Sequence, residues 1–308
     1  MDKRLNRSDY LLSLVFIFLL VCIAGAFFFG LQLGQQRTES KHAALLSARE
    51  DAAKKPGAYE QQHLVSYYHT IYTPYREFAN RWFDKMKELE LQAHTIDASS
   101  VFKDLSKAAD DKYTALSKVA TPDTSPLLGE AHQNILKSLK LFAESSKSFQ
   151  SKANSLAPGD VLAEVDKDAY FREAKKFALQ GEQQFYMSMV KWNETINPQV
   201  KGANLLGQTA YSKKEWDQMG INAKNAAVSS ILLREVRYLP LYPQDMTVRI
   251  DEWFAGGQAQ KMNLNDIQQI IDLLAETGSA RKGDFVTRKE KWYGGDTLPQ
   301  LPFFYENK

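Results

Sequence analysis

The chain has almost no cysteine. Its single cysteine, Cys22, lies inside a long apolar run near the N-terminus. One cysteine cannot form an intrachain disulfide, and outside that run the chain has no thiol for nucleophilic or metal chemistry. A part of the chain that lies outside the cytoplasm therefore carries no disulfides, which suits a bacterial envelope protein better than a eukaryotic ectodomain.

The chain also lacks an excess of charge of either sign. It has 39 Lys and Arg residues against 37 Asp and Glu residues, for a formal net charge of +2. A balanced surface exerts no general attraction on nucleic acid or on anionic lipid headgroups. The composition therefore predicts no nucleic-acid partner.

Motifs that carry chemistry are missing as well. No GxSxG sequence marks a nucleophile. The histidines form no HExxH sequence; they are His42, His63, His69, His94 and His132. Glycan cleavage needs only two carboxylates, but the sequence gives no reason to nominate a pair among 37 acidic residues. We predict no catalytic residue, no metal and no cofactor, and an activity on envelope glycan stays open.

One short pattern resembles part of a metal site. Glu60 and His63 have the Glu-x-x-His spacing of four-helix di-iron sites, which require two such pairs and two further glutamates. A second pair is absent, because Glu130 and His132, like Glu90 and His94, have other spacings. The pattern is better interpreted as an exposed charged turn at the start of a helix.

The chain has a single long hydrophobic run. Leu11 to Leu31 reads LLSLVFIFLLVCIAGAFFFGL, with no charged residue and no polar stripe. A helix needs about 20 apolar residues to cross ~30 Å of hydrocarbon, so we predict a signal-anchor helix over residues 11–34 that crosses the bilayer once. Lys3, Arg4 and Arg7 precede the run, and the positive-inside rule therefore assigns residues 1–10 to the cytoplasm. The body that follows is expected on the extracytoplasmic side of the cell membrane.

Three further hypotheses concern this run. A signal peptide cleaved after Ala24-Gly25-Ala26 is disfavoured, because the apolar run continues through Phe27-Phe28-Phe29. A lipoprotein anchored at Cys22 is disfavoured, since Val21 stands where a small residue is expected. The small residues Ala26, Gly30 and Gly34 recur every four positions, a spacing that allows two anchors to pack as a homodimer.

Helical periodicity dominates the rest of the chain. Residues 35–57 resemble a connector that ends at Lys54-Lys55-Pro56-Gly57. Four segments with apolar residues at 3–4 spacing follow, and they predict an elongated, antiparallel up-down four-helix bundle over residues 58–198. The boundaries between them are marked by Asp97 as an N-cap, by Ser125-Pro126 as a cap and first turn, by Ala157-Pro158-Gly159-Asp160, and by Asn197-Pro198.

The regular spacing of apolar residues is interrupted more often after Pro198. We expect one helix over Ser212–Arg237 and another from Asn265-Asp266 to Thr277, closed by Gly278. The last thirty residues form an irregular aromatic tail, which should fold back onto a core because so many exposed rings would favour aggregation. Residues 199–308 are thus predicted as a smaller, mainly helical C-terminal subdomain, either independent or sharing a core with the bundle.

The densest aromatic cluster is the candidate binding surface. Tyr68, Tyr72, Tyr75, Phe78 and Trp82 follow a helical rhythm around Pro74, which should kink the helix or free a carbonyl. Such a helix can line a ligand pocket or a partner groove. The competing interpretation is that the rings fill a wide bundle core.

Three functions remain. The first is a membrane-anchored scaffold or binding protein of the cell envelope, with a protein partner. The second is a small-ligand sensor-type module, which would need a partner chain because only about ten residues face the cytoplasm. The third is an envelope glycan- or wall-modifying enzyme.

Overall fold

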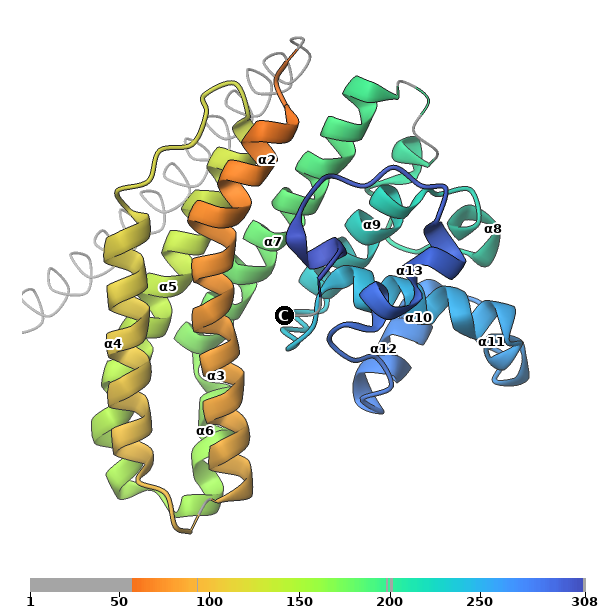
Figure 1. Cartoon of the computed structure of the whole chain (residues 1–308). Helices are drawn as coiled ribbons and strands as arrows, with labels where there is room; N and C mark the ends of the chain where they lie inside the picture. Colours follow the sequence, from red (N-terminus) through yellow and green to blue (C-terminus); the bar gives the residue numbers. More distant parts are fainter. Residues whose placement is uncertain (1–56, 93, 198, 200–201, 307–308) are drawn as a thin grey trace, which may run out of the picture. The chain divides into compact units, whose positions relative to one another are not determined.

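The computed structural model describes residues 57–92, 94–197, 199 and 202–306. Within these ranges the chain is mainly helical and has no strand, which confirms the mainly helical part of the predicted fold class (Figure 1). The described residues belong to one compact unit. A division of this unit into two domains at residues 198–199 stays a prediction.

Four long helices lie side by side and form the bundle (Figure 1). The first runs from Gln61 to Leu91 as α2 (Gln61–Tyr67), a π-helical turn η1 (Tyr68–Tyr72) and α3 (Thr73–Leu91). It is followed by α4 (Ala98–Leu116), α5 (Pro126–Lys152) and α7 (Ala169–Ile196). Irregular connections join the first three, and α5 is joined to α7 by residues 153–168, which include a short helix.

The helix starts follow local sequence signals to different degrees. Asp97 caps α4 as predicted, because its carboxylate accepts a hydrogen bond from the Ser99 N–H at 3.0 Å. Ser125 does precede Pro126 at the start of α5, but it makes no cap hydrogen bond. Its hydroxyl donates instead to the Ala58 carbonyl, which ties the start of the first helix to the start of α5.

The fourth predicted segment is two helices. The 3-10 turn η3 (Pro158–Asp160) leads into α6 (Val161–Lys167), and α7 begins after Asp168. The Asp168 carboxylate accepts bonds from the Phe171 N–H and from the Ser145 hydroxyl, both at 2.9 Å. A side chain of α5 thus contacts the break, and the division into two helices accounts for the less regular spacing of apolar residues here.

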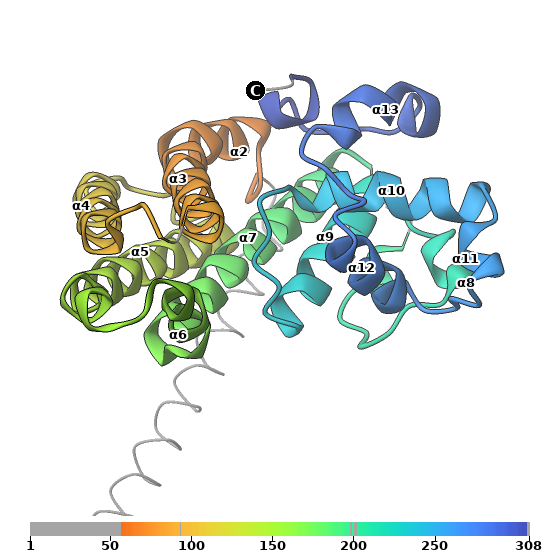
Figure 2. The same cartoon turned by 90° about the horizontal axis from the view of Figure 1, so that it is seen from below.

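Helix α7 forms a wall shared by both parts of the fold. It lies between α5 and α9 (Ile221–Arg234) in both views (Figure 1 and Figure 2). Its close contact with α5 depends on Gly181, where an added Cβ would lie 3.0 Å from the Ala131 carbonyl oxygen. Leu179 of the same helix packs into the hydrophobic core of the C-terminal part, which is the part of the chain that follows α7.

The C-terminal part is built around α9 and α10 (Pro243–Ala255). The shorter helices around them are α8 (Lys213–Trp216), α11 (Gln258–Lys261), α12 (Ile267–Glu276) and α13 (Asp284–Tyr293), with 3-10 turns η4 (Ala203–Leu205) and η5 (Pro302–Phe304). As predicted, α12 is followed by Gly278 in a left-handed conformation, with φ of +59°. The Ser279 N–H donates to the Leu274 carbonyl and completes this helix end.

The predicted helix Ser212–Arg237 is wrong in its middle. The chain turns between Trp216 and Ile221, so α8 and α9 are separate helices. In one straight helix, residues five apart would point about 140° away from each other. With the turn, Trp216 and Ile221 are both buried, at 0% and 2% exposed.

The aromatic tail folds back, as predicted. Leu301 and Phe304 are 0% exposed and Phe303 is 6% exposed. The Phe303 ring lies 5.2 Å from the Tyr68 ring and 6.4 Å from the Phe185 ring, measured between centroids. The end of the chain therefore packs against both the first helix and α7.

Other predictions lie outside the described residues. These are the cytoplasmic tail 1–10, the membrane anchor 11–34 with its Ala26, Gly30 and Gly34 face, and almost all of the connector 35–57. Among the residues that the structure does describe, no helix has the length and apolar character needed to cross a bilayer.

Candidate functional site

The five predicted aromatic residues lie along the first helix and are all buried. Tyr68 is 8% exposed, and Tyr72, Tyr75, Phe78 and Trp82 are at most 2% exposed. Trp82 packs against Phe142 of α5 and Phe171 of α7 at centroid distances of 4.7 and 4.9 Å, whereas Tyr68 and Tyr72 pack against Phe303. In this structure the rings fill space between elements, and a binding role for them stays a prediction.

The helix is irregular just before Pro74. Residues Tyr68–Tyr72 form a π-helical turn, and the Thr73 N–H donates to the Tyr68 carbonyl five residues earlier. Pro74 has no N–H, so a regular α-helical bond to the Thr70 carbonyl cannot form. The irregularity expected at Pro74 is thus a local widening of the helix.

A buried ion pair lies beside these rings. Arg76 of α3 is 4% exposed and Glu182 of α7 is 8% exposed, with Nη1 and Oε1 3.6 Å apart. The Tyr72 hydroxyl donates to the same Oε1 at 2.7 Å. Burial raises the pKa of Glu182, while Arg76 and the Tyr72 hydroxyl act in the opposite direction. A buried charge requires such partners, since its desolvation is costly.

The ion pair also reaches the C-terminal part. Arg76 Nη2 donates to the Leu241 carbonyl at 3.4 Å, and its guanidinium lies 4.5 Å from the centre of the Tyr242 ring. Nearby, the hydroxyls of Tyr75 and Tyr238 are 2.7 Å apart. The polar network therefore joins α3 and α7 to the segment between α9 and α10.

Arg76 and Glu182 were not among the predicted site residues, although their positions in the sequence carry a signal. Arg76 lies four residues after Tyr72 and three before Ala79, within the apolar stripe of its helix. Glu182 holds a similar place three residues before Phe185. A charged residue at a stripe position indicates a buried partner of opposite charge, but not which one.

A first cleft lies beside α8, α9 and the end of α13. It has a cavity volume of about 400 Å³. Asp251 in its wall accepts hydrogen bonds from Trp216 Nε1 at 2.6 Å, from Lys224 at 2.8 and 3.0 Å, and from the Tyr293 hydroxyl. Burial and the nearby Asp251 raise the pKa of Tyr293 well above its ordinary value, which keeps the phenol protonated.

Aromatic side chains complete this first cleft. Phe254, Trp292 and Tyr293 contribute to its walls. The indole nitrogen Nε1 of Trp292 is buried and has no hydrogen-bond partner among the described residues. The cleft thus combines aromatic side chains with a neutralised Lys224–Asp251 pair.

A second cavity adjoins the first and shares Gly220, Ile221 and Asp296 with it. Its volume is about 220 Å³. Asn193 of α7 and Asn222 of α9 line it, and the side-chain oxygen of each is buried without a donor in the part of the chain that the structure describes. The second cavity is therefore rich in amide groups.

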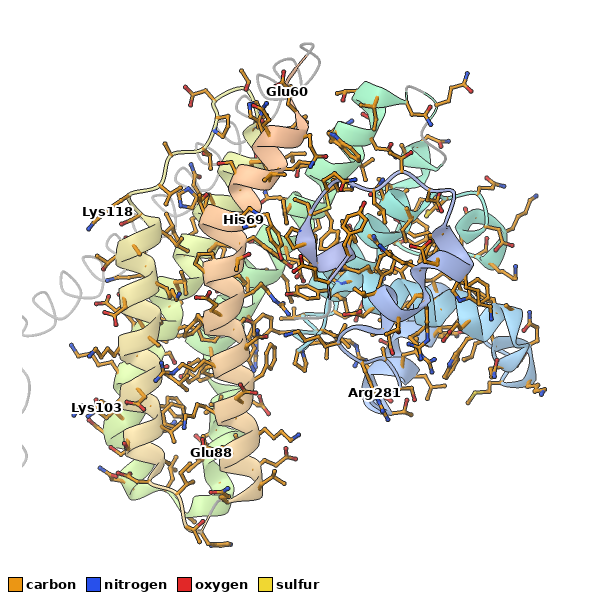
Figure 3. The ribbon with its side chains drawn as sticks, in the orientation of Figure 1. Glu60, His69, Glu88, Lys103, Lys118 and Arg281 are labelled. Carbon is orange, nitrogen blue, oxygen red and sulfur yellow. The ribbon has the colours of Figure 1, made fainter. Side chains whose placement is uncertain are left out.

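A third, separate groove runs along the outside of α4 and α5. Lysines predominate in its walls, and the one labelled in Figure 3, Lys103, points outward from α4. Asp110 and Glu144 also line the groove, and Glu144 lies 3.5 Å from Lys140. The groove is thus only moderately basic.

The Glu60–His63 pattern lies at the start of the first helix (Figure 3). His63 Nδ1 is 3.0 Å from the Ser125 hydroxyl, so this histidine links two helix starts. In the described ranges, no three His, Cys, Asp or Glu side chains are grouped so that they could hold a metal ion.

Comparison with known proteins adds no family to this description. No protein-family model, no curated protein and no solved structure matches the chain. The fold and the clefts themselves define a mainly helical protein with a polar, aromatic-walled double cleft beside α9.

Proposed function

We propose that this protein is a membrane-anchored, extracytoplasmic helical scaffold or binding protein of the cell envelope. Residues 11–34 anchor it in the lipid bilayer by a single span, residues 1–10 face the cytoplasm, and the body binds a protein partner outside. A homodimer through Ala26, Gly30 and Gly34 is part of this proposal.

The observation that carries the proposal is the continuity of the body. Arg76 joins the bundle to the C-terminal part through Leu241 and Tyr242, and Phe303 joins them through Tyr68, so buried contacts connect the two parts. A body of this kind presents its surfaces in a constant geometry, which limits the entropy lost when a partner binds. That property suits a platform held next to a membrane.

The double cleft favours a second candidate, a module that binds a small ligand. Sites for small ligands are concave, with apolar walls and a few polar groups that set orientation. The cleft beside Asp251 and Trp292 is concave and is lined by both aromatic and polar side chains. Because only about ten residues face the cytoplasm in the proposed topology, a signal would pass through a partner chain. The hypothesis of an envelope glycan-modifying enzyme stays a prediction without a nominated carboxylate pair.

Topology is tested by reporters fused after Lys308. A phosphatase that is active only after export should be active, a reporter that requires the cytoplasm should be inactive, and N-terminal sequencing should find residues 1–34 retained. A mature chain that begins at Phe27 would contradict the retained anchor.

Partner binding is tested by crosslinking the full chain in cells and purifying it from membranes. We expect a stoichiometric partner that persists when residues 1–34 are replaced by an unrelated anchor and disappears when the body is replaced. The anchor dimer is tested separately, since Gly30→Ile should reduce crosslinked dimer without removing the partner.

A further inference from the structure

The groove along α4 and α5 has a floor of small side chains and walls of lysine. Its volume is about 440 Å³. Ser106 of α4 and Ala143 of α5 form the floor, where the Ser106 hydroxyl donates to the Ala143 carbonyl at 2.9 Å. Because both side chains are small, they leave a hollow between the longer side chains on either side. Lys103, Lys107 and Lys147 stand around that hollow and are exposed to solvent.

The lysines of this groove differ in their ion pairs. Lys140 lies 3.5 Å from the Glu144 carboxylate. Lys103, Lys107 and Lys147 form no ion pair with any residue that the structure describes. Three positive charges in one groove are therefore not balanced from within the described part of the chain.

The side of α4 that faces α3 is organised differently. There Asp104 lies 3.8 Å from Arg81 of α3, and Lys112 pairs with Glu77 of α3. These four charges are matched within the protein. The unmatched positive charge of α4 is thus on the groove side, where an outside partner can reach it.

Hydrogen bonds between α4 and α5 give the order of the side chains along the groove. The Ser99 hydroxyl donates to the Gln150 carbonyl at 2.8 Å, and Ser106 donates to the Ala143 carbonyl. Residue numbers rise along α4 while they fall along α5 between these two contacts. The two helices are therefore antiparallel, and each position of α4 faces a known position of α5.

The charge of the groove changes along its length. The register places Lys103 and Lys147 across from each other near one end, with Lys107 one helical turn from Lys103. At the other end it places Asp110 across from Lys140. One end of the groove is therefore basic, and the other carries charges of both signs.

We propose that this groove docks an acidic segment of a protein partner. Carboxylates of such a segment would lie beside the three unpaired lysines, whose apolar stems offer further contact area. A uniform polyanion, such as nucleic acid, fits less well because it would also bring negative charge to Asp110 and Glu144. A protein segment can place neutral or basic side chains there. This inference rests on the proposed function, since it names the surface and the chemistry by which the scaffold binds its partner.

The first test is a titration of the full-length chain in a zwitterionic detergent, followed by fluorescence anisotropy. The probes are a labelled peptide in which glutamate alternates with alanine, and a labelled oligothymidylate of the same net charge. We expect saturable binding of the peptide that weakens as salt is raised. The groove variant, Lys103→Gln, Lys107→Gln and Lys147→Gln together, should weaken it about tenfold, because three modest ion pairs are lost at once.

A matched control removes the same charge elsewhere. Lys214→Gln, Lys261→Gln and Lys282→Gln together change three exposed lysines of the C-terminal part. This control variant should bind the peptide within about twofold of wild type, since charges well beyond the Debye length are screened. Glutamine and lysine have similar helix propensities, so both variants should melt within a few degrees of wild type.

The second test is crosslinking in cells. The groove variant should lose the stoichiometric partner that wild type captures, and the control variant should keep it. A partner that the groove variant still captures would overturn the groove as the docking site and leave the scaffold function intact. If wild type captures no partner, the proposed function fails, and the peptide titration still decides whether the groove binds an acidic segment.

Three results of the titration would also overturn the inference. The first is the absence of saturable peptide binding at low salt by a folded protein. The second is equal weakening by the groove variant and the control variant, which would indicate a general attraction rather than a site. The third is tighter binding of oligothymidylate than of the peptide, lost in the groove variant, which would make the groove a site for polyanions.

Discussion

Arg76 of α3 and Glu182 of α7 form a buried ion pair, 3.6 Å apart, at the place where the bundle meets the C-terminal part. Arg76 also contacts the Leu241 carbonyl and the Tyr242 ring, so three parts of the chain converge on one guanidinium. Removing one member of such a pair leaves an uncompensated buried charge, which is more harmful than removing both.

Glu182→Gln should therefore destabilise the protein by about 3–5 kcal/mol, because Arg76 keeps its charge without a counter-ion. Denaturant unfolding followed by circular dichroism measures the change. The double variant Arg76→Met, Glu182→Gln should recover part of the loss. If Glu182→Gln unfolds at the wild-type midpoint, the pair does not form as described.

Trp82→Ala should cost about 3–5 kcal/mol of unfolding free energy, because Trp82 is 1% exposed and packs against two phenylalanine rings. Leu91→Ala, on the same helix at a residue 72% exposed, is the control and should change stability by less than about 0.5 kcal/mol. A Trp82→Ala protein as stable as wild type would mean that the ring lies on a surface.

Two glycines should respond to alanine with opposite signs. Gly181→Ala places a methyl group 3.0 Å from the Ala131 carbonyl oxygen and from Ile135 Cγ1, so we expect a loss of about 1–3 kcal/mol. Gly129→Ala, in α5, meets only the Thr121 hydroxyl at 3.6 Å, and should stabilise by about 0.5–1 kcal/mol through its higher helix propensity. Thermal melting of both variants and of wild type measures these two changes in stability. Equal effects would contradict the close α5–α7 approach.

Asp245 should make stability depend on pH. Burial raises the pKa of this carboxyl from 3.8 to about 6, although the N–H groups of Phe285, Tyr242 and Gly283 donate to it. The folded state therefore holds the proton more tightly than the unfolded chain does. The stabilisation is complete below about pH 4 and is lost as the pH rises through about 6.

The measurement is the difference in unfolding free energy between wild type and Asp245→Asn at several pH values. We expect wild type to lose about 2–3 kcal/mol relative to the variant between pH 4 and pH 7. Burial lowers the pKa of His132, which changes stability in the opposite direction, but this contribution is common to both proteins and cancels. A flat difference would contradict the raised pKa.

Local signals predicted what local contacts decide. Asp97 caps α4 and Gly278 follows α12, because each acts on backbone groups within a few residues of itself. The break at Asp168 was not predicted, since it also involves Ser145 on another helix. The turn between Trp216 and Ile221 was missed for the same reason, because Trp216 is held by Asp251, far along the chain.

The candidate site shows the same limit. The sequence identified the aromatic stripe that includes Tyr72 and Trp82, and left open whether it forms a core or a surface. Side chains on α5, on α7 and in the C-terminal tail cover it in the structure. The double cleft could not be predicted at all, because Asn193, Asn222 and Trp292 come from three different helices and follow no motif.

By itself, the sequence determined the helical class, several helix ends and the one apolar run, because periodicity and capping act over a few residues. Only the tertiary structure decided that Arg76 meets Glu182 and that Phe303 closes over Tyr68. Tertiary structure alone also brought Asn193, Asn222 and Trp292 to the walls of two adjoining cavities. The physical reason is that burial and charge pairing depend on which distant residues become neighbours. Packing of the whole chain determines those neighbours.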